Sequence, residues 1–343
     1  MDMRQLGMFD ESDRLAKISK LGDSLETLQN VIDWNMFRPL LNEAMKKSHR
    51  GAGGRPPFDY LLMFKILVLQ KIYNLSDEQT EFQINDRMSF MRFLGLGLND
   101  TVPDAKTIWN FRDCLTKAGV MKPLFDLFVR KLDSENLITR TGTIVDATFV
   151  EAPRPHYTKE EKEQINKGEV PERYQGNIHK IRQTDFDARW TKKAGLPHYG
   201  YKDHIKVDSD SKIITDFVAT AASVHDSQPA PGMITKEDNV LYGDSAYWGK
   251  PLKEALPEEV ETQICERGTK KNPLTEEQKQ NNREKSRIRS RIEHVFGYMN
   301  NSMNGTSVRS IGLPRAEFSI GLLNLVYNIR RYEFLTRPKK ANA

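Results

Sequence analysis

Cysteine is scarce in this sequence, and its scarcity excludes several classes of protein. Among the 343 residues there are two cysteines, Cys114 and Cys265, which lie far apart and within apolar patterns. Small secreted domains are held together by several disulfides, and structural zinc sites use clusters of cysteine and histidine ligands. Two isolated thiols therefore suggest neither a disulfide framework nor a cysteine-based zinc site.

Long apolar runs and nucleotide-binding glycine motifs are also missing. No stretch approaches the roughly 18 uncharged apolar residues that a membrane-spanning helix requires. The N-terminal sequence "MDMRQLGMFDESDR" lacks the apolar segment of a secretory signal peptide. No P-loop pattern occurs, so the chemistry is not expected to use nucleotide hydrolysis. These absences predict a soluble cytoplasmic protein that does not contact a membrane.

The N-terminal part of the chain, residues 1–135, is predicted to be all-α. Apolar residues recur at helical spacing within 1–45, and two further helical patterns lie near 75–95 and 105–118. The block "YLLMFKILVLQKIY" (60–73) is apolar on almost every side, which indicates a buried helix. Such a helix serves either core packing or dimerisation.

The pattern changes after residue 135, where β-branched residues and period-two alternation begin. The segment "TGTIVDATFVEAP" (141–153) predicts a strand, and the charged stretch 154–195 predicts a surface insertion. There follow a predicted hairpin around the turn "DSDS", a strand at "NVLYG", a short helix, a strand at "VETQICERG" and two final helices. Strands and helices in this order predict an α/β fold over residues 136–335, with a mixed sheet flanked by helices.

Positive charge is concentrated in two places, although the whole chain carries only +5. The segment "KKSHRGAGGRPP" (46–57) is a basic loop, and residues 267–291 contain nine Lys or Arg against three Glu, a local charge of +6. Such clusters are typical of surfaces that bind phosphate backbones. A solvated helix face explains the charge of 267–291 equally well, so charge alone does not decide between the two.

Three acids occupy positions where a carboxylate needs an explanation. Asp146 lies within an apolar strand, Asp244 follows the strand "VLYG", and Glu293 lies on a predicted helix. An acid inside an apolar strand is costly unless it is paired, protonated or bound to a cation. Each of the three is therefore either a metal ligand or a member of an ordinary ion pair or turn.

The helix that contains Glu293 gives these alternatives a geometry. At about 100° per residue, one side of the predicted helix is an apolar stripe that faces the core. The stripe beside it contains Ser286, Arg289, Glu293 and Asn300. Arg289 then either pairs with Glu293 one turn away or binds a phosphate that approaches the same site.

Taken together, these segments resemble the DDE transposases of bacterial insertion sequences, most closely the insertion-sequence-five group. Asp146 in "TIVDATFVEAP", Asp244 in "LYGDSAYWG" and Glu293 in "RIRSRIEHVFG" are similar to the three signature regions of that family. The similarity also covers "VPDAKTIWNFRDCL", "DARWTKKAGLPHYGYKDHIKVD", "VHDSQ" and "LLNLVYNIRRY". The resemblance implies an RNase H-like catalytic domain at 136–335 and a helical DNA-binding or dimerisation domain at 1–135.

The resemblance further implies that Asp146, Asp244 and Glu293 are catalytic and bind metal, namely two Mg²⁺ ions that Mn²⁺ can replace. Carboxylate oxygens suit Mg²⁺, and two such ions can activate an attacking oxygen and stabilise a leaving one. The residues expected near this site are His225, Asp226 and Tyr247. His225 is more often a structural or DNA-contacting residue than a ligand, and the Tyr247 ring could stack on an unpaired base.

Cationic and polar side chains are expected to contact DNA. The predicted contacts are Arg289, Arg287, Arg291, Lys285, Ser286, Asn300, Lys46, Lys47, Arg50 and Arg55. In the wider superfamily, a Tyr and an Arg precede the acid of the helix and a Lys follows it. Arg289 fits this pattern, whereas Ser286 stands at the Tyr position and Asn300 at the Lys position. These two differences affect the expected contacts with the DNA end, and the three acids are unchanged.

The implied function is that of a transposase. It would bind the terminal inverted repeats of its element, cleave the ends by metal-dependent hydrolysis, and join the 3′-hydroxyls to target DNA by transesterification. Double-stranded DNA is the expected partner, and a homodimer is expected in the complex. The alternatives are a transposase-derived repressor without strand transfer, which has no need of the three acids, and a metal-dependent nuclease that never joins strands.

Overall fold

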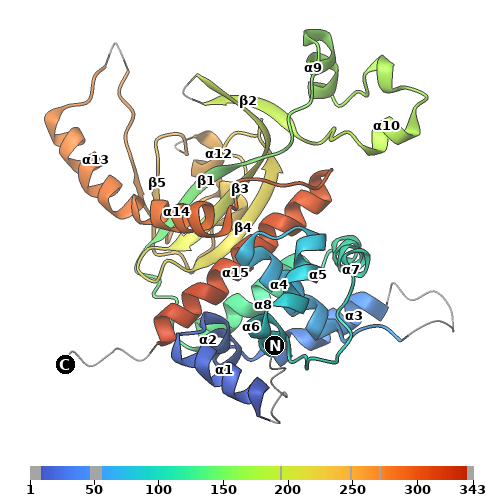
Figure 1. The fold of residues 1–343 in the computed structure, drawn as a ribbon. Coiled ribbons are helices and arrows are strands. Elements are labelled where there is room, and N and C mark those ends of the chain that lie inside the picture. The colour runs from blue at the N-terminus through green and yellow to red at the C-terminus, as the bar shows by residue number, and fades with distance from the viewer. Residues whose placement is uncertain (1–8, 47–55, 194, 248, 270–271, 338–343) are drawn as a thin grey trace. The chain divides into compact units, whose positions relative to one another are not determined.

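The computed structural model describes residues 9–46, 56–193, 195–247, 249–269 and 272–337 (Figure 1). The chain groups into two compact units, Met1–Val120 together with Ile329–Ala343, and Met121–Asn328. The domain limits predicted from the sequence, 1–135 and 136–335, stay a prediction, because compactness alone does not define an independently folding domain. Each unit is described separately below.

The first unit is helical throughout its described N-terminal residues, as the sequence predicts. Its elements are α1 (Asp10–Lys20), α2 (Ser24–Val31), η1 (Trp34–Phe37), α3 (Arg38–Lys46), α4 (Tyr60–Tyr73), α5 (Asp77–Asp86), α6 (Met88–Leu94) and α7 (Ala105–Ala118). The single helix predicted near 75–95 is two helices, because the backbone is extended at Arg87.

Helix α4 is the buried helix of this unit. It begins where the Asp59 carboxylate accepts a hydrogen bond from Leu62 N at 2.9 Å, and it ends at Asn74, which has a left-handed backbone. Asp104 caps α7 in the same way, since its carboxylate accepts a hydrogen bond from Thr107 N at 2.6 Å. Residues 63–70 of α4 are all buried, and the helix contacts α3, α5, α6 and α7, so it packs into the core of its own unit.

The second unit contains the sheet. Its elements are α8 (Met121–Ser134), β1 (Thr143–Glu151), α9 (Lys159–Asn166), η2 (Glu172–Tyr174), α10 (Ile178–Arg182), β2 (Arg189–Lys193), β3 (Leu196–Asp208), β4 (Ile214–Ala221), α11 (Ala230–Met233), β5 (Val240–Gly243), α12 (Lys250–Ala255), β6 (Glu261–Ile264), α13 (Glu276–Arg289), α14 (Arg291–Met303) and α15 (Leu313–Thr336). The last residues of α15 belong to the first unit.

The sheet is mixed and has the order β2-β3-β1-β5-β6, with β4 pairing with β3. Strand β1 is antiparallel to β3 and parallel to β5, and β5 is parallel to β6. Helices flank this sheet, so the predicted α/β class is confirmed. The hairpin predicted around "DSDS" is the β3–β4 pair.

Part of the predicted surface insertion belongs to the sheet. Residues 154–195 contain the helices α9 and α10, but they also contain β2, which pairs with β3. The sequence "RWTKK" of β2 has a polar, charged composition, so its pairing depends on the neighbouring strand more than on its own pattern.

Different helices pack against different strands of the sheet. Val145 belongs to an apolar cluster that includes residues of α11, α12 and β6. On the side of α15, the amide of Asn328 bridges the backbone of Ile214 with bonds of 2.9 and 2.7 Å. Among the described residues, no helix combines the length and apolar character needed to cross a membrane.

Candidate active site

Two of the predicted acids lie near each other where two parallel strands adjoin: Asp146 on β1, and Asp244 directly after the end of β5. Ile144 of β1 is level with Tyr242 of β5, and each acid stands two residues further along the chain. Asp146 and Asp244 therefore lie at the same level of the sheet. Burial raises the pKa of the Asp146 carboxyl, and the neighbouring Asp244 raises it further. The raised pKa is what two carboxylates in one partly buried site produce.

A cation already lies against this pair. Nη1 of Arg289 donates a hydrogen bond to Oδ2 of Asp146 at 3.0 Å, with the two side chains 24% and 16% exposed. Oδ1 of Asp146 accepts a second bond from Ala147 N at 2.8 Å. The Ala147 amide and the guanidinium lower the pKa of Asp146, but burial outweighs them. In Asp244, Oδ1 accepts a bond from Ala246 N at 2.8 Å.

The helix predicted to carry Arg289 and Glu293 is broken between them. Helix α13 ends at Arg289, α14 begins at Arg291, and Ser290 makes the junction. The hydroxyl of Ser290 donates to the carbonyl of Arg287 at 2.9 Å instead of capping α14. Arg289 and Glu293 therefore do not share one helical stripe, and Arg289 pairs with Asp146 instead of Glu293.

Glu293 is exposed and has no ion pair within the described part of the chain. The structure brings Asp146 and Asp244 together and leaves Glu293 apart from them. Nowhere among the described residues do three His, Cys, Asp or Glu side chains lie close enough to hold a metal ion.

The predicted DNA contacts of α13 and α14 differ in what they touch. Arg287 is exposed, whereas Nζ of Lys285 donates to the Ile264 carbonyl at 3.2 Å. Ser286 lies 3.6 Å from Sγ of Cys265, and Asn300 is half-buried. Of this group, the exposed Arg287 is the cation with the greatest freedom to bind a phosphate.

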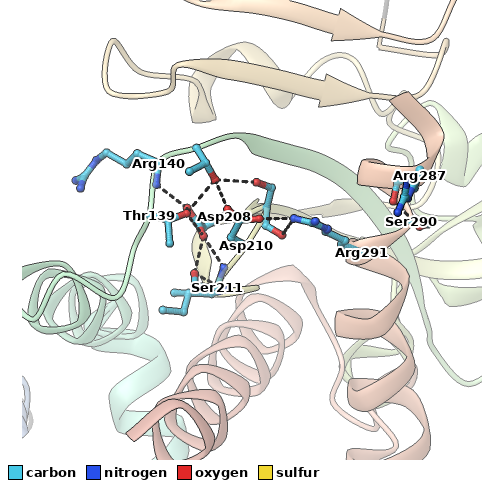
Figure 2. Close-up of polar contacts among 11 residues, drawn as sticks. Thr139, Arg140, Asp208, Asp210, Ser211, Arg287, Ser290 and Arg291 are labelled. Carbon is cyan, nitrogen blue, oxygen red and sulfur yellow. Dashed lines mark hydrogen bonds and ion pairs between the residues drawn. The ribbon is translucent and has the colours of Figure 1, made fainter. Parts of the chain in front are cut away.

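Arg291 joins a separate acid cluster at the β3–β4 turn, the Asp208–Asp210 cluster (Figure 2). Its Nη1 donates to a carboxylate oxygen of Asp210 and, at 3.1 Å, to the carbonyl of Ser209. Asp210 also accepts a bond from the Thr141 hydroxyl at 2.6 Å. This contact holds the first residue of α14 at the turn.

Asp208 is the saturated acid of the same cluster. Its carboxylate accepts bonds from the Thr139 hydroxyl at 3.0 Å, from Arg140 N at 2.8 Å, and from both N and Oγ of Ser211 at 2.7 Å (Figure 2). Four donors on a carboxylate that is almost wholly buried define a structural role for Asp208.

Of the predicted basic loop, 46–57, only the first residue and the last two are described. Lys46 is exposed at the end of α3. Lys47, Arg50 and Arg55 lie outside the described residues.

The three residues predicted near the site lie in different environments. His225 is exposed, and its Nδ1 lies 2.8 Å from the Ser227 hydroxyl. Asp226 pairs with Nζ of Lys202 at 2.7 Å. Tyr247 is 2% exposed within the apolar cluster of Val145, so its ring is not available to stack on a base.

One face of β3 carries buried polar residues that the sequence reading did not single out. Nζ of Lys202 binds Asp226, Nε2 of His204 lies 2.9 Å from the Thr220 hydroxyl, and Nζ of Lys206 lies 3.1 Å from Asp238. Burial lowers the pKa of His204 to about 4. The signal in the sequence is the spacing of two residues within an apolar strand, which places the three side chains on one face.

The acid pair has the chemistry of a site for a hard divalent cation. Asp146 and Asp244 supply oxygen donors, and the guanidinium of Arg289 stands in as the positive charge at Asp146. Oxygen ligands of this kind suit Mg²⁺. The residues present therefore fit a divalent metal, with Asp146 and Asp244 as the residues that would hold it.

Comparisons with known protein families identify the family of this chain. Residues 138–329, more than half of the chain, match the family described as "Transposase DDE domain", and residues 12–114 match one described as "Transposase domain". The chain belongs to the transposase DDE family. It is thus a DNA transposase of the insertion-sequence type, a class of enzyme that depends on divalent metal.

A solved structure is also similar to this chain. The piggyBac transposase in a synaptic complex with hairpin DNA shares 13% sequence identity with it, at a TM-score of 0.42. The match covers 88% of this chain and 74% of that chain.

Proposed function

We propose that this transposase binds the terminal inverted repeats of an insertion sequence, cleaves the ends by hydrolysis, and joins the resulting 3′-hydroxyls to target DNA. The observation that carries the proposal is the placement of Asp146 on β1 beside Asp244 at the end of the parallel strand β5, with Arg289 on Asp146 at 3.0 Å. The proposal includes the assignment of this transposase to the insertion-sequence-five group.

The proposed cofactor is Mg²⁺, bound as two ions that Mn²⁺ can replace. When bound, it supplies activation of the attacking oxygen and stabilisation of the leaving oxygen. Asp146, Asp244 and Glu293 are the residues that would hold it. Water is the nucleophile of the first step, and the liberated 3′-hydroxyl is the nucleophile of the second, so one set of residues serves both steps.

Glu293 must approach the acid pair for this set to be complete. The junction at Ser290 gives α14 a point about which its first turn can reorient relative to α13. The first turn of α14 is held by the buried side chains of Ile292 and Val295 and by the Arg291–Asp210 ion pair, whose side chains are 42% and 44% exposed. Ion pairs this exposed contribute about 0–1 kcal/mol, so the apolar side chains supply most of the resistance to such a movement.

Arg289 has a role both in the metal-free site and in the metal-bound site. In the structure it balances the charge of Asp146. A divalent cation at Asp146 would repel the guanidinium, which is then free to bind a phosphate of the DNA. This exchange reconciles the predicted DNA contact of Arg289 with its observed ion pair.

The remaining proposed contacts follow from exposure and charge. Arg287 on α13 and Lys46 at the end of α3 are exposed cations suited to the phosphate backbone. Helix α13 has no buried residue, which leaves its basic face open to DNA. We further propose that the enzyme acts as a homodimer on paired ends in the bacterial cytoplasm.

The test is a cleavage and joining assay with the full-length protein. Labelled duplexes that carry the DNA flanking its gene are incubated with Mg²⁺ and a supercoiled target plasmid. The proposal predicts new 3′-hydroxyl ends at the repeats and labelled strands joined to the plasmid. Cutting without joining would identify a nuclease, and binding without cutting would identify a repressor. Either result would refute the proposal.

A further inference from the structure

The hydroxyl of Tyr247 is a buried hydrogen-bond donor without a partner among the described residues. The side chain is 2% exposed. Its apolar cluster includes Val145, Leu241, Leu252 and Ile264. The phenol ring is thus accounted for by packing, and the hydroxyl is not.

Burying this hydroxyl without a hydrogen-bond partner destabilises the folded protein. A phenylalanine would fill the same space in the apolar cluster without burying an unsatisfied polar group. A donor left unpaired in the absence of a ligand points to an acceptor that arrives or reorients when the site is loaded. The surroundings of the hydroxyl show which acceptors are available.

Tyr247 lies in the turn after β5, three residues beyond Asp244 of the acid pair. Its backbone N–H donates to the carbonyl of Asp244 at 3.1 Å, which closes the turn after β5. The pairing of β1 with β5 ends at Ile144 and Tyr242. The turn that contains Tyr247 therefore lies just beyond the paired part of these strands, near Asp146. Burial raises the pKa of Tyr247, and the charges of Asp146, Asp226 and Asp244 raise it further.

The acids within reach are not equally free to accept. Asp226 is engaged by the ammonium of Lys202 at 2.7 Å. Asp146 depends on Arg289 for its second hydrogen bond, and among the described residues the Asp244 carboxylate accepts one, from the amide of Ala246. The acid pair therefore has acceptor capacity to spare, and Asp226 has less.

We propose that Tyr247 is a positioning residue of the active site, whose hydroxyl donates a hydrogen bond to a carboxylate oxygen of the Asp146–Asp244 pair, directly or through one water. The bond forms when a divalent cation takes the place of Arg289. It fixes the orientation in which the carboxylates hold the cation, as hydrogen bonds to metal-binding carboxylates do elsewhere. The inference rests on the proposed metal site of the previous subsection.

The test uses Tyr247→Phe, with Tyr201→Phe as the matched control. Tyr201 is also buried, but its hydroxyl is satisfied, since it donates to the Asp185 carboxylate at 2.8 and 2.7 Å. Two quantities are measured on the full-length protein: the dissociation constant of Mn²⁺ by electron paramagnetic resonance, and the metal-free melting temperature. Binding is measured with a pre-cleaved terminal-repeat duplex, so that no hydrolysis occurs.

The two variants are expected to behave in opposite ways. Tyr247→Phe weakens Mn²⁺ binding about 10- to 100-fold, with the melting temperature unchanged or raised. Tyr201→Phe lowers the melting temperature, because it leaves the buried Asp185 with fewer donors, and it leaves Mn²⁺ binding unchanged. Wild-type Mn²⁺ affinity in Tyr247→Phe, or a loss of melting temperature like that of Tyr201→Phe, would overturn the inference. A wild-type protein that binds no Mn²⁺ would instead refute the proposed function.

Discussion

Two acid clusters in the sheet unit, each bound by an arginine, differ in how fully their carboxylates are satisfied. In the Asp208–Asp210 cluster, Asp208 accepts from four donors (Figure 2). In the proposed active-site pair, Asp146 accepts from two donors within the described part of the chain, Ala147 N and Arg289, and burial keeps its pKa raised. A saturated carboxylate marks a structural joint, whereas an under-satisfied pair with a raised pKa marks a place where a ligand completes the site.

The two arginines are neighbours in the sequence and serve different clusters. Arg289 ends α13 and binds Asp146, and Arg291 begins α14 and binds Asp210. Two residues apart on a continuous helix, the two side chains would lie about 200° apart, on nearly opposite sides. The spacing and the junction at Ser290 together send the two guanidinium groups to different places.

The largest expected effect is on catalysis by the acid pair. Asp146→Asn and Asp244→Asn each remove a charge that holds the cation, and several kcal/mol of charge stabilisation correspond to a loss of about 10³-fold or more in strand cleavage. Binding to terminal-repeat duplexes should remain close to wild type. A gel assay of cleavage and a binding titration check the two parts, and cleavage at wild-type rates by either variant would contradict the assignment of that acid.

Asp208→Ala should show the opposite pattern from the acid-pair variants. It removes the acceptor for the Thr139 hydroxyl and for the backbone N–H groups of Arg140 and Ser211. Buried donors left without partners cost about 3 kcal/mol of unfolding free energy. Urea unfolding measures this loss, and the fraction that stays folded should still cleave DNA. Loss of cleavage without loss of stability would break the comparison.

Arg289→Gln tests whether Arg289 only neutralises Asp146 in the metal-free protein or also supports metal binding. Without the guanidinium, Asp146 has no competing cation, so the protein without DNA should bind Mn²⁺ more tightly, by about tenfold for each 1.4 kcal/mol of competition removed. DNA binding should weaken, because a phosphate contact is lost. Calorimetric titration with Mn²⁺ measures the first effect. A variant that binds Mn²⁺ more weakly than wild type would show that Arg289 supports the metal site.

The sequence predicts the strands well because they depend on local patterns, and the same patterns pick out Asp146 as a candidate site residue. Alternation marks β1 and β3, and Asp146 stands out because its neighbours along the strand are apolar. The break at Ser290 was not predicted, since the residues around it read as one helical stripe. The partner of Arg289 was not predicted either, because Asp146 is 143 residues away and only the tertiary fold brings them together.

A smaller effect is expected from the pH dependence of stability. The pKa of Asp146 lies above its usual 3.8 because of burial, so the folded state holds this proton more tightly than the unfolded state. Its stabilising contribution is present below pH 3.8 and is lost as the pH rises through the raised pKa. Relative to wild type, Asp146→Asn should therefore gain stability as the pH rises through this window. Urea unfolding at a series of pH values checks the sign, and parallel curves would contradict it.

Arg291→Ala should have the smallest effect on stability. Its ion pair with Asp210 is more than 40% exposed on both sides. Such pairs are worth about 0–1 kcal/mol of unfolding free energy. Thermal unfolding measures the change, and Arg289→Gln serves as the comparison on the other side of Ser290. A loss much larger than this would mean that the turn cluster anchors α14 more firmly than its exposure indicates.

The central claim is that the divalent metal binds at Asp146 and Asp244, and iron-directed cleavage of the protein tests it most directly. Fe²⁺ placed in a Mg²⁺ site reduces added hydrogen peroxide to hydroxide and a hydroxyl radical, which cuts the polypeptide close to the ion. The account predicts fragments that end near residues 146 and 244, lost in Asp146→Asn and suppressed by excess Mg²⁺. Cuts confined to the turn at 208–211, or a pattern unchanged in Asp146→Asn, would contradict it.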